Sequence, residues 1–259
     1  MQQQQCRKQQ IKMLVLDQRK LLPRIGGRKI HYLIKPILQN KILKCGRDKL
    51  FDIMRENNLL IKPRRRYIQT TNSKHWMKKY PNKAKQIAIN APEQVWVSDI
   101  TYLKTEEGNC YLNMITDAYS RKIIGYCVAD NMEAITMRRA LDMAITNRLY
   151  PGQPLIHHSD RGLQYCSSEY VSKANDHNIS MSMTEQSDPY ENALAERMNR
   201  TIKEEFCLDC TLKTKNLAIA AVRQAVHLYN SYRPHLSLSL KTPDQQHQKT
   251  QPPEAVGLI

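Results

Sequence analysis

From residue 93 onward, the apolar residues follow two alternating spacings. Short runs rich in β-branched and aromatic residues, separated by turn-forming residues, predict strands. Longer stretches with apolar residues three or four positions apart predict amphipathic helices. The predicted strands are residues 95–103, 110–116, 122–129, 155–158 and 179–184. The predicted helices are residues 132–149, 168–177, 192–206 and 216–232.

The order of these elements indicates a fold class. Three antiparallel strands come first, and units of one helix and one strand follow. This order is that of the ribonuclease-H-like fold, an α/β architecture in which a mixed sheet is flanked by helices. We therefore expect such a sheet over residues 93–250.

The first third of the chain has a helical pattern of a different kind. Residues 1–20 are rich in Gln and then in Lys and Arg, and we expect a frayed or helical lead-in there. An amphipathic helix should begin at Gly27, and Pro36 should kink it or end it early. A second short helix should follow Gly46. Two short basic helices followed by a basic arm are typical of a helix-turn-helix DNA-binding domain.

These patterns divide the chain into five parts. They are a basic lead-in (1–20), a small basic domain resembling a helix-turn-helix (21–66), a linker (67–92), a catalytic core (93–250) and a tail (251–259).

Charge is distributed unevenly between these parts. The whole chain has a net charge of +16, and residues 1–90 hold 23 Lys and Arg against four acids. The remaining residues hold 17 Lys and Arg against 20 acids and are therefore close to neutral. Such asymmetry favours a polyanion-binding module joined to a domain with another task. A basic surface that merely faces solvent is the alternative.

Composition excludes several other classes of protein. With 41% hydrophobic and 25% charged residues, the 259-residue chain is neither collagen-like nor wholly disordered. No apolar run approaches the roughly 18–20 residues that cross a bilayer, and no signal-peptide pattern is present. Seven scattered cysteines, an odd number, argue against a disulfide scaffold. We expect a protein of the cytosol without membrane association.

Three acids stand at positions that suit metal-dependent chemistry. Asp99 lies inside the first strand of the core, where a carboxylate is costly unless a cation compensates it. Asp160 directly follows the fourth strand, and Glu196 lies on a predicted helix. Between Asp160 and Glu196 there are 35 residues. Lys203 follows Glu196 by two helical turns and therefore shares its face of the helix.

The segments around these acids resemble the DDE transposases and integrases, most closely the bacterial insertion-sequence transposases whose second reading frame encodes an integrase-like core. The resemblance runs from about residue 20 to 247 and rests on four stretches. They are His158-Ser159-Asp160-Arg161-Gly162-Leu163-Gln164-Tyr165, Asn192-Ala193 to Glu196, Lys203-Glu204-Glu205-Phe206, and Tyr229-Asn230-Ser231-Tyr232-Arg233-Pro234-His235 with Thr242-Pro243. The 35-residue interval between the last two acids is also typical of this family.

The resemblance implies a metal-dependent DNA transposase. Asp99, Asp160 and Glu196 would be the catalytic acids and would hold two Mg²⁺ ions, with Mn²⁺ as a substitute. The reaction would be strand cleavage followed by 3′-OH strand transfer into target DNA. The implied partners are terminal inverted repeats, target DNA, further copies of the chain on DNA, and a protein from an upstream reading frame.

Several residues receive DNA-binding or supporting roles. Lys203 would contact a DNA phosphate near the cut, and the basic N-terminal domain would bind the DNA ends. Its nominated DNA-binding residues are Arg47, Lys49, Arg64, Arg65 and Arg66. His158 and Asn192 are expected to support the acids.

Some alternatives stay open at this point. Glu191 competes with Glu196 as the third acid, and His157 could contact phosphate or orient a neighbour. Asp117 either approaches the site or caps a turn. Cys207 and Cys210 have zinc-knuckle spacing, but a second pair is missing. For function, the alternatives are a ribonuclease-H-like nuclease without strand transfer and a DNA-binding regulator with an inactive core.

Overall fold

The computed structural model describes residues 2–61, 78–185 and 192–248. The strands are β1 (Val95–Thr105), β2 (Gly108–Asp117), β3 (Ile123–Ala129), β4 (Leu155–Ser159) and β5 (Ile179–Met183). The helices are α1 (Gln2–Leu21), α2 (Gly27–Asn40), α3 (Arg47–Glu56), α4 (Ala134–Thr146), α5 (Leu163–Cys166), α6 (Ser168–Asn175), α7 (Ala193–Glu205), α8 (Lys215–Ser231) and α9 (Pro243–Gln248). Short 3-10 turns lie at Ala84–Gln86 and Leu236–Leu238. Within the described ranges, no helix is both long and apolar enough to span a bilayer.

One five-stranded sheet organises the core, in the order β3-β2-β1-β4-β5. β1, β2 and β3 form an antiparallel meander, while β4 and β5 run parallel to β1. The mixed sheet predicted from the strand pattern is confirmed, and β1 lies at its centre. A carboxylate on β1 is therefore flanked by strands on both sides.

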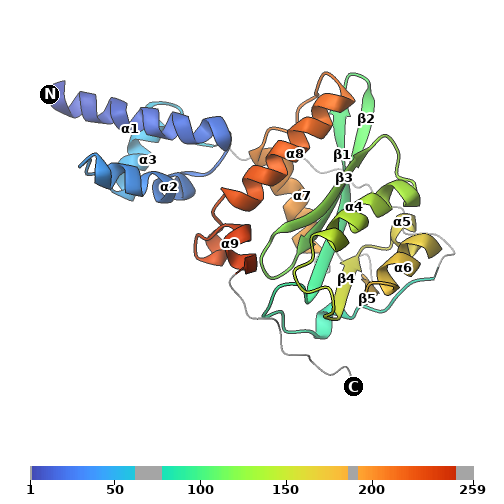
Figure 1. Ribbon diagram of the computed structural model, residues 1–259. Helices are drawn as coiled ribbons and strands as arrows, with labels where there is room; N and C mark the ends of the chain where they lie inside the picture. Colours follow the sequence, from blue (N-terminus) through green and yellow to red (C-terminus); the bar gives the residue numbers. More distant parts are fainter. Residues whose placement is uncertain (1, 62–77, 186–191, 249–259) are drawn as a thin grey trace.

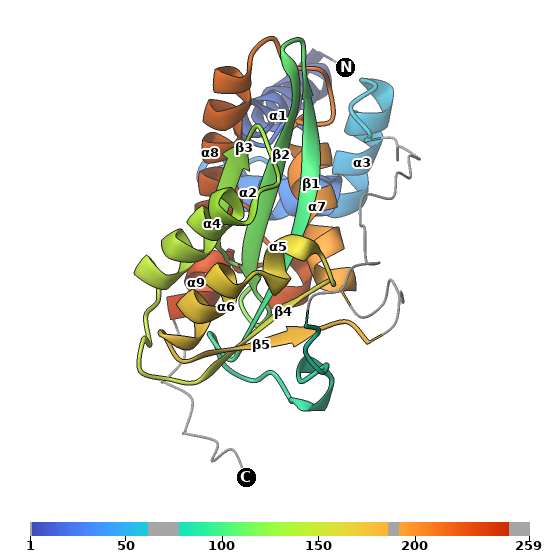
Figure 2. The same cartoon turned by 90° about the vertical axis from the view of Figure 1, so that its right-hand side faces the viewer.

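Helices cover both faces of the sheet (Figures 1 and 2). α4, α5 and α6 pack on one face, around a cluster that includes Trp96, Leu141 and Tyr170. α7 and α8 pack on the other face, around Leu112, Ile202 and Val222. The sheet therefore lies between two separate apolar layers, which fixes the position of α7 against β1.

Gly125 on β3 shows how closely α4 approaches the sheet. A Cβ atom at this position would lie 2.1 Å from the carbonyl oxygen of Ala140 and 2.8 Å from the Cβ of Ala144. Any side chain here would push α4 away from the sheet, so the contact requires glycine.

The N-terminal residues form a packed three-helix module. The predicted lead-in is α1, and its Ile11 and Val15 are buried against α2 and α3. α2 continues past Pro36 to Asn40, contrary to the expected early end. Ile30, Ile34 and Leu38 are buried on one side of α2, whereas Pro36 is exposed. Burial of that apolar face maintains the helix, and the proline ring occupies its solvent side.

This module contacts the end of α7. The backbone N–H of Arg24 donates to the carbonyl of Glu205 at 3.1 Å, and Nζ of Lys29 lies 3.2 Å from Oε1 of Glu205. Arg233 grips the same carboxylate with two hydrogen bonds, of 2.7 Å from Nε and 2.6 Å from Nη2. The hydroxyl of Tyr232 donates to Gln18 of α1 at 3.0 Å. Glu205 is thus shared by the module and the core.

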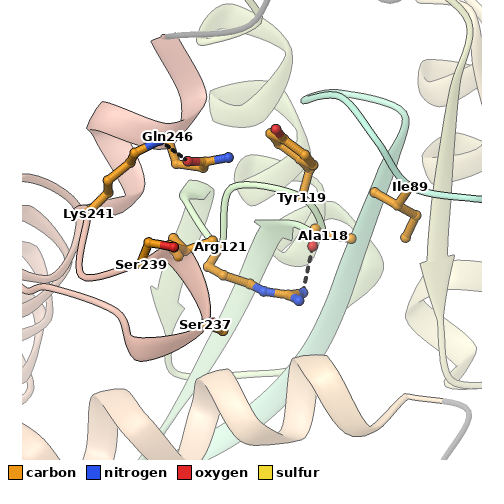
Figure 3. Close-up of a pocket in the computed structure, with 9 residues that line it drawn as sticks. Ile89, Ala118, Tyr119, Arg121, Ser237, Ser239, Lys241 and Gln246 are labelled. Atoms are coloured by element: carbon orange, nitrogen blue, oxygen red, sulfur yellow. Dashed lines mark hydrogen bonds between the residues drawn. The ribbon is translucent and has the colours of Figure 1, made fainter.

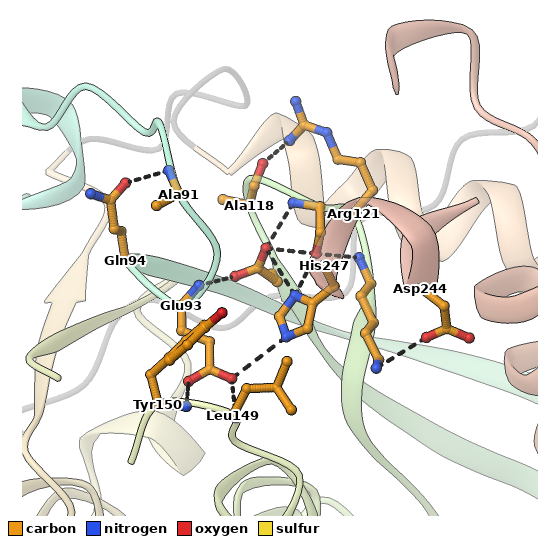
Figure 4. A network of polar contacts seen from close by, with 12 residues as sticks. Ala91, Glu93, Gln94, Ala118, Arg121, Leu149, Tyr150, Asp244 and His247 are labelled. Carbon is orange, nitrogen blue, oxygen red and sulfur yellow. Dashed lines mark hydrogen bonds and ion pairs between the residues drawn. The ribbon is translucent and has the colours of Figure 1, made fainter. Parts of the chain in front are cut away.

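A buried polar network anchors α9 to the beginning of β1 (Figure 4). His247 lies between two carboxylates, with Nε2 3.5 Å from Glu93 and Nδ1 3.8 Å from Asp117. Nδ1 also lies 2.9 Å from the hydroxyl of Ser120. Glu93 further accepts from the backbone N–H of Leu149 at 2.6 Å and pairs with Arg148. The segment after α8 is therefore an integral part of the core.

Asp117 has the turn-capping role that was one of its two alternatives. Its Oδ1 accepts from the backbone N–H and the hydroxyl of Ser120, each at 2.7 Å. Its Oδ2 accepts from the backbone N–H of Glu93 at 2.7 Å. Both oxygens of Asp117 are occupied by this turn and by the chain entering β1.

Candidate active site

Asp99 lies half-buried in the middle of β1. Its Oδ2 accepts from the side-chain amide of Asn199 on α7 at 2.9 Å, and its Oδ1 accepts from the backbone N–H of Ile100. Burial, followed by the nearby charge of Asp160, raises the pKa of Asp99 to about 7, and the charge of Glu196 adds to this effect. Asp99 is thus held in a position where its negative charge is costly.

Asp160 lies beside Asp99 because their strands are neighbours. β1 and β4 run parallel, and their pairing extends to Ser98 opposite Ser159, one residue before each acid. Oδ1 of Asp160 accepts from the backbone N–H of Gly162 at 3.0 Å. A Cβ atom at Gly162 would lie 3.0 Å from that oxygen, so glycine leaves room for the turn. The loop after β4 thereby positions the second acid.

Glu196 comes from the first turn of α7 and is exposed. Partial burial raises the pKa of Glu196, and the charge of Asp160 adds to this effect. Asn192, directly before α7, donates to the backbone carbonyl of Ser98 at 3.0 Å. Asn192 and Asn199, which lie before and after Glu196 in the sequence, therefore fasten α7 to Ser98 and Asp99 of β1.

The chemistry of these three side chains suits a hard divalent cation. They offer only carboxylate oxygens, the ligands that Mg²⁺ and Mn²⁺ prefer. Burial raises the pKa values of Asp99 and Glu196, and the charges of neighbouring acids add to the effect, so a bound cation would favour the charged carboxylates. Among the described residues, no three His, Cys, Asp or Glu side chains already stand close enough to form a complete metal site. The donors fit the ion, and they would have to draw together around it.

Lys203 is bound to the sheet. Its Nζ donates to the hydroxyl of Thr101 at 3.2 Å and to the carbonyl of Tyr102 at 2.9 Å. The ammonium also lies 4.6 Å from the centre of the Tyr102 ring. Burial lowers the pKa of Lys203. The side chain therefore joins α7 to β1, two turns beyond Glu196.

The two histidines before Asp160 point to opposite faces of the sheet. Nε2 of His157 lies 3.2 Å from the hydroxyl of Tyr170, and burial lowers the pKa of His157 to about 3. His157 is therefore a neutral core residue. Nδ1 of His158 lies 2.9 Å from the hydroxyl of Ser182, which accepts from the backbone N–H of Lys83. His158 thus helps to hold the chain segment that approaches β5.

Two of the DNA-binding residues nominated in the N-terminal domain lie on α3. Arg47 and Lys49 are exposed at the beginning of α3, and Arg47 pairs with Asp48 at 2.9 Å. Arg64, Arg65 and Arg66 lie outside the described residues, as does Glu191.

The cysteines with zinc-knuckle spacing follow α7. Sγ of Cys210 donates to the backbone carbonyl of Cys207 at 3.0 Å, and both residues carry free thiols. No metal-binding cluster includes them within the described ranges.

Several residues of the site carried no signal in the sequence pattern. Asn199 is one helical turn after Glu196, and only the packing of α7 on β1 reveals its bond to Asp99. The anchoring of α7 by Glu205 at its other end is equally a product of packing.

Comparison with known proteins identifies the family. Integrase core domain models match residues 89–189 and 177–243. The insertion element IS600 31 kDa protein of Shigella sonnei is 35% identical over 80% of this chain and 76% of its own length. The transposase for insertion sequence element IS904 of Lactococcus lactis is 31% identical over 81% of this chain and 83% of its own length.

A solved structure supports the fold. The chain resembles the simian T-cell lymphotropic virus intasome with PP2A regulatory subunit B56 gamma, with a TM-score of 0.54 and 18% identity over 90% of this chain and 78% of that one. The ribonuclease-H-like arrangement expected from the strand order is therefore confirmed. Because the integrase core models match and both relatives are more than 30% identical over most of their length, the chain belongs to the insertion-sequence DDE transposases, which are polynucleotidyl transferases.

Proposed function

We propose that this transposase cuts DNA at the ends of its insertion sequence and joins the released 3′-OH to target DNA. The observation that carries the proposal is the arrangement of Asp99, Asp160 and Glu196. Asp99 lies on β1, Asp160 directly follows the parallel neighbouring strand β4, and Glu196 lies on a helix that is hydrogen-bonded to β1 through Asn192 and Asn199. Their charges act on one another, as the raised pKa values of Asp99 and Glu196 record.

The three carboxylates would hold two Mg²⁺ ions, or Mn²⁺ in their place. When bound, such ions activate the attacking oxygen and stabilise the leaving oxygen of a phosphodiester. Asp99 would contribute from the central strand, Asp160 from the loop after β4 and Glu196 from the first turn of α7. Asn199 keeps the carboxylate of Asp99 oriented through its hydrogen bond to Oδ2. The mechanism needs no covalent bond between enzyme and DNA, so no serine or tyrosine nucleophile is assigned.

Lys203 has a geometry that suits a contact to a DNA phosphate near the cut. An ammonium group has three N–H donors, and Thr101 and Tyr102 use two of them. The third can reach a phosphate oxygen without breaking the link between α7 and β1. This arrangement would place a fixed positive charge two turns from Glu196.

The N-terminal module would bind the terminal inverted repeats. Arg47 and Lys49 are exposed at the beginning of α3, where side chains of a recognition helix meet DNA. Arg64, Arg65 and Arg66 would add backbone contacts that weaken as salt rises. We further propose that copies of the chain assemble on DNA, that an upstream-frame protein is a partner, and that the protein acts in the bacterial cytosol.

The test uses an oligonucleotide duplex that ends with the element's terminal repeat, incubated with the full chain and Mg²⁺. Cleavage at the end and a longer strand-transfer product are expected. Asp99→Asn should lose both products while still binding the duplex. Hydrolysis without a longer product would favour the nuclease alternative, and binding without cleavage would favour the regulator. Glu204→Gln, a surface change on the same helix, is the matched control and should retain both products.

A further inference from the structure

A polar pocket of about 370 Å³ opens near the turn between β2 and β3 (Figure 3). It lies between this turn and the loop that leads into α9. Its polar lining residues are Tyr119, Arg121, Ser237, Ser239, Lys241 and Gln246. None of the residues that line it is acidic. The pocket is thus distinct from the three carboxylates.

Its two basic side chains have no ion pair within the described part of the chain. One N–H of Arg121 donates to the backbone carbonyl of Ala118 at 2.5 Å, and Nζ of Lys241 lies 3.4 Å from the amide oxygen of Gln246. The acid on α9, Asp244, is paired with Lys122 at 3.0 Å. Asp117 acts on Arg121 through its charge, but its oxygens bond to Ser120 and Glu93. The pocket therefore retains positive charge.

The backbone around the pocket is held in a conformation that ordinary residues avoid. Arg121 has a φ of 65°, Ser239 of 53° and Leu240 of 65°, all in the left-handed region. Hydrogen bonds maintain these positions. The hydroxyl of Tyr229 donates to the carbonyl of Arg121 at 3.0 Å, and the N–H of Leu240 donates to the carbonyl of His235 at 2.7 Å. Such strain is concentrated at ligand-binding sites.

The pocket borders the catalytic helix. Ala118, which lines the pocket, belongs to the same buried cluster as Ala195 on α7. Ala195 immediately precedes Glu196. A DNA strand bound at Glu196 would reach the pocket only by extending beyond the beginning of α7.

We propose that this pocket binds a phosphate group of the DNA backbone, a second contact beyond the acids and the N-terminal module. Arg121 and Lys241 supply the positive charge, and the hydroxyls of Ser237 and Ser239 supply neutral donors. The proposal rests on the proposed function, because it requires DNA as the ligand. Free inorganic phosphate offers the same chemistry, and the test separates these two sources.

The experiment measures binding of the full chain to a short fluorescent DNA duplex at several KCl concentrations. Each phosphate neutralised contributes about 0.9 to the slope of log affinity against log salt. Lys241→Gln and Arg121→Gln should each reduce the slope by about that amount. Arg121→Lys, which keeps the charge, should restore it. Lys213→Gln, which removes an exposed charge in the α7–α8 connection, is the matched control and should leave the slope unchanged.

Circular dichroism confirms that each variant is folded before its slope is measured. Unchanged slopes in folded Lys241→Gln and Arg121→Gln, beside a normal slope for the unaltered chain, would overturn the pocket and leave the proposed function intact. Absence of DNA binding by the unaltered chain would instead remove the proposed function. A rise in melting temperature with inorganic phosphate that Lys241→Gln abolishes, without any change in DNA slope, would assign the pocket to a free anion and contradict the proposal.

Discussion

The side-chain amide of Asn199 donates to Oδ2 of Asp99 at 2.9 Å, across the contact between α7 and β1. Glu196 lies one helical turn earlier on the same helix. The helix therefore supplies one acid of the site and orients another. Side chains that hydrogen-bond to a metal ligand commonly affect metal affinity strongly, because they orient the ligand. This bond is the basis of the first two predictions.

Removal of the amide should weaken metal binding while leaving the fold intact. In Asn199→Ala, Asp99 loses a donor that lowers its pKa, so its carboxylate holds a proton more tightly. The Mg²⁺ concentration required for half-maximal cleavage should rise about 10- to 100-fold, as for other changes behind a metal ligand. Asn199→Gln, which retains the amide, should recover part of the loss. A normal Mg²⁺ requirement in Asn199→Ala would exclude a positioning role.

Metal binding should depend on pH through Asp99. Its pKa of about 7 means that the metal-free site holds a proton below pH 7, and the metal must displace it. Mg²⁺ affinity should therefore fall towards pH 6 and level off above pH 8. Calorimetry in buffers of different ionisation enthalpy should detect about one proton released at pH 6. No proton release would contradict the raised pKa.

The same pKa predicts the stability of the metal-free protein. The pKa of Asp99 is about 7 in the folded state, above its ordinary value of 3.8. Its contribution to the stability of the fold is therefore fully present below pH 3.8 and is lost as pH rises through 7. In EDTA at pH 8, Asp99→Asn should therefore be more stable than the unaltered chain by more than about 1 kcal/mol, since one pKa unit corresponds to about 1.4 kcal/mol. Chemical denaturation at pH 5 and pH 8 tests this. An equal difference at both values would refute it.

Glu196 and Glu191 can be separated by the same substitution at each position. Glu196→Gln should lose cleavage and strand transfer, because we propose Glu196 as the third acid and the charge of Asp160 acts on its carboxylate. Glu191→Gln should retain both activities. The opposite result would make Glu191 the third acid, and gel analysis of the products is sufficient to decide.

Loss of Arg233 should destabilise the fold, because the carboxylate of Glu205 would lose its main partner. Arg233→Met removes both of its hydrogen bonds to Glu205, and Lys29 alone remains. Loss of one partner of a buried ion pair costs about 3 kcal/mol or more. The double variant Arg233→Met with Glu205→Gln should recover much of this loss, as measured by urea denaturation. A double variant no more stable than Arg233→Met would show that the pairing is not the cause.

The network around His247 should stabilise the fold within a limited pH range. Burial lowers the pKa of His247, but the contacts to Asp117 and Glu93 outweigh burial, so the net pKa is raised above 6.5. Burial raises the pKa of Glu93, but its contacts with His247 and the backbone outweigh that, so the net pKa falls below 4.5. Both groups contribute fully between pH 4.5 and 6.5. The stability advantage over His247→Gln should be largest there and decline as pH rises through the raised pKa.

The sequence pattern was sufficient for the sheet because its information is local. β-branched runs and turn-formers bounded each strand within two residues of its observed ends. The early end expected at Pro36 was wrong because helix propensity takes no account of burial. One side of α2 is buried, and Pro36 lies on the exposed side. The short α9 lacked enough residues for a periodic signal, although His247 is buried in the core.

For the candidate site, the pattern could nominate acids but could not show how they are held. Asn199 and Asp99 are 100 residues apart, and their bond depends on the packing of α7. Lys203 shared a helix face with Glu196, yet its position against Thr101 and Tyr102 required the tertiary contact. The pocket at Arg121 and Lys241 joins segments 120 residues apart that have no common motif.

The grip of Arg24 and Lys29 on Glu205 bears on the engineering of chimeric transposases. α7 is 13 residues long, about 20 Å, with Glu196 near its beginning and Glu205 at its end. A chimera in which a foreign DNA-binding module replaces the residues before 78 loses the surface that contacts Glu205. Only the covalent linker would then connect the foreign module to the core. A grafted module that retains Gln18, Arg24 and Lys29 should therefore keep its contact with the core.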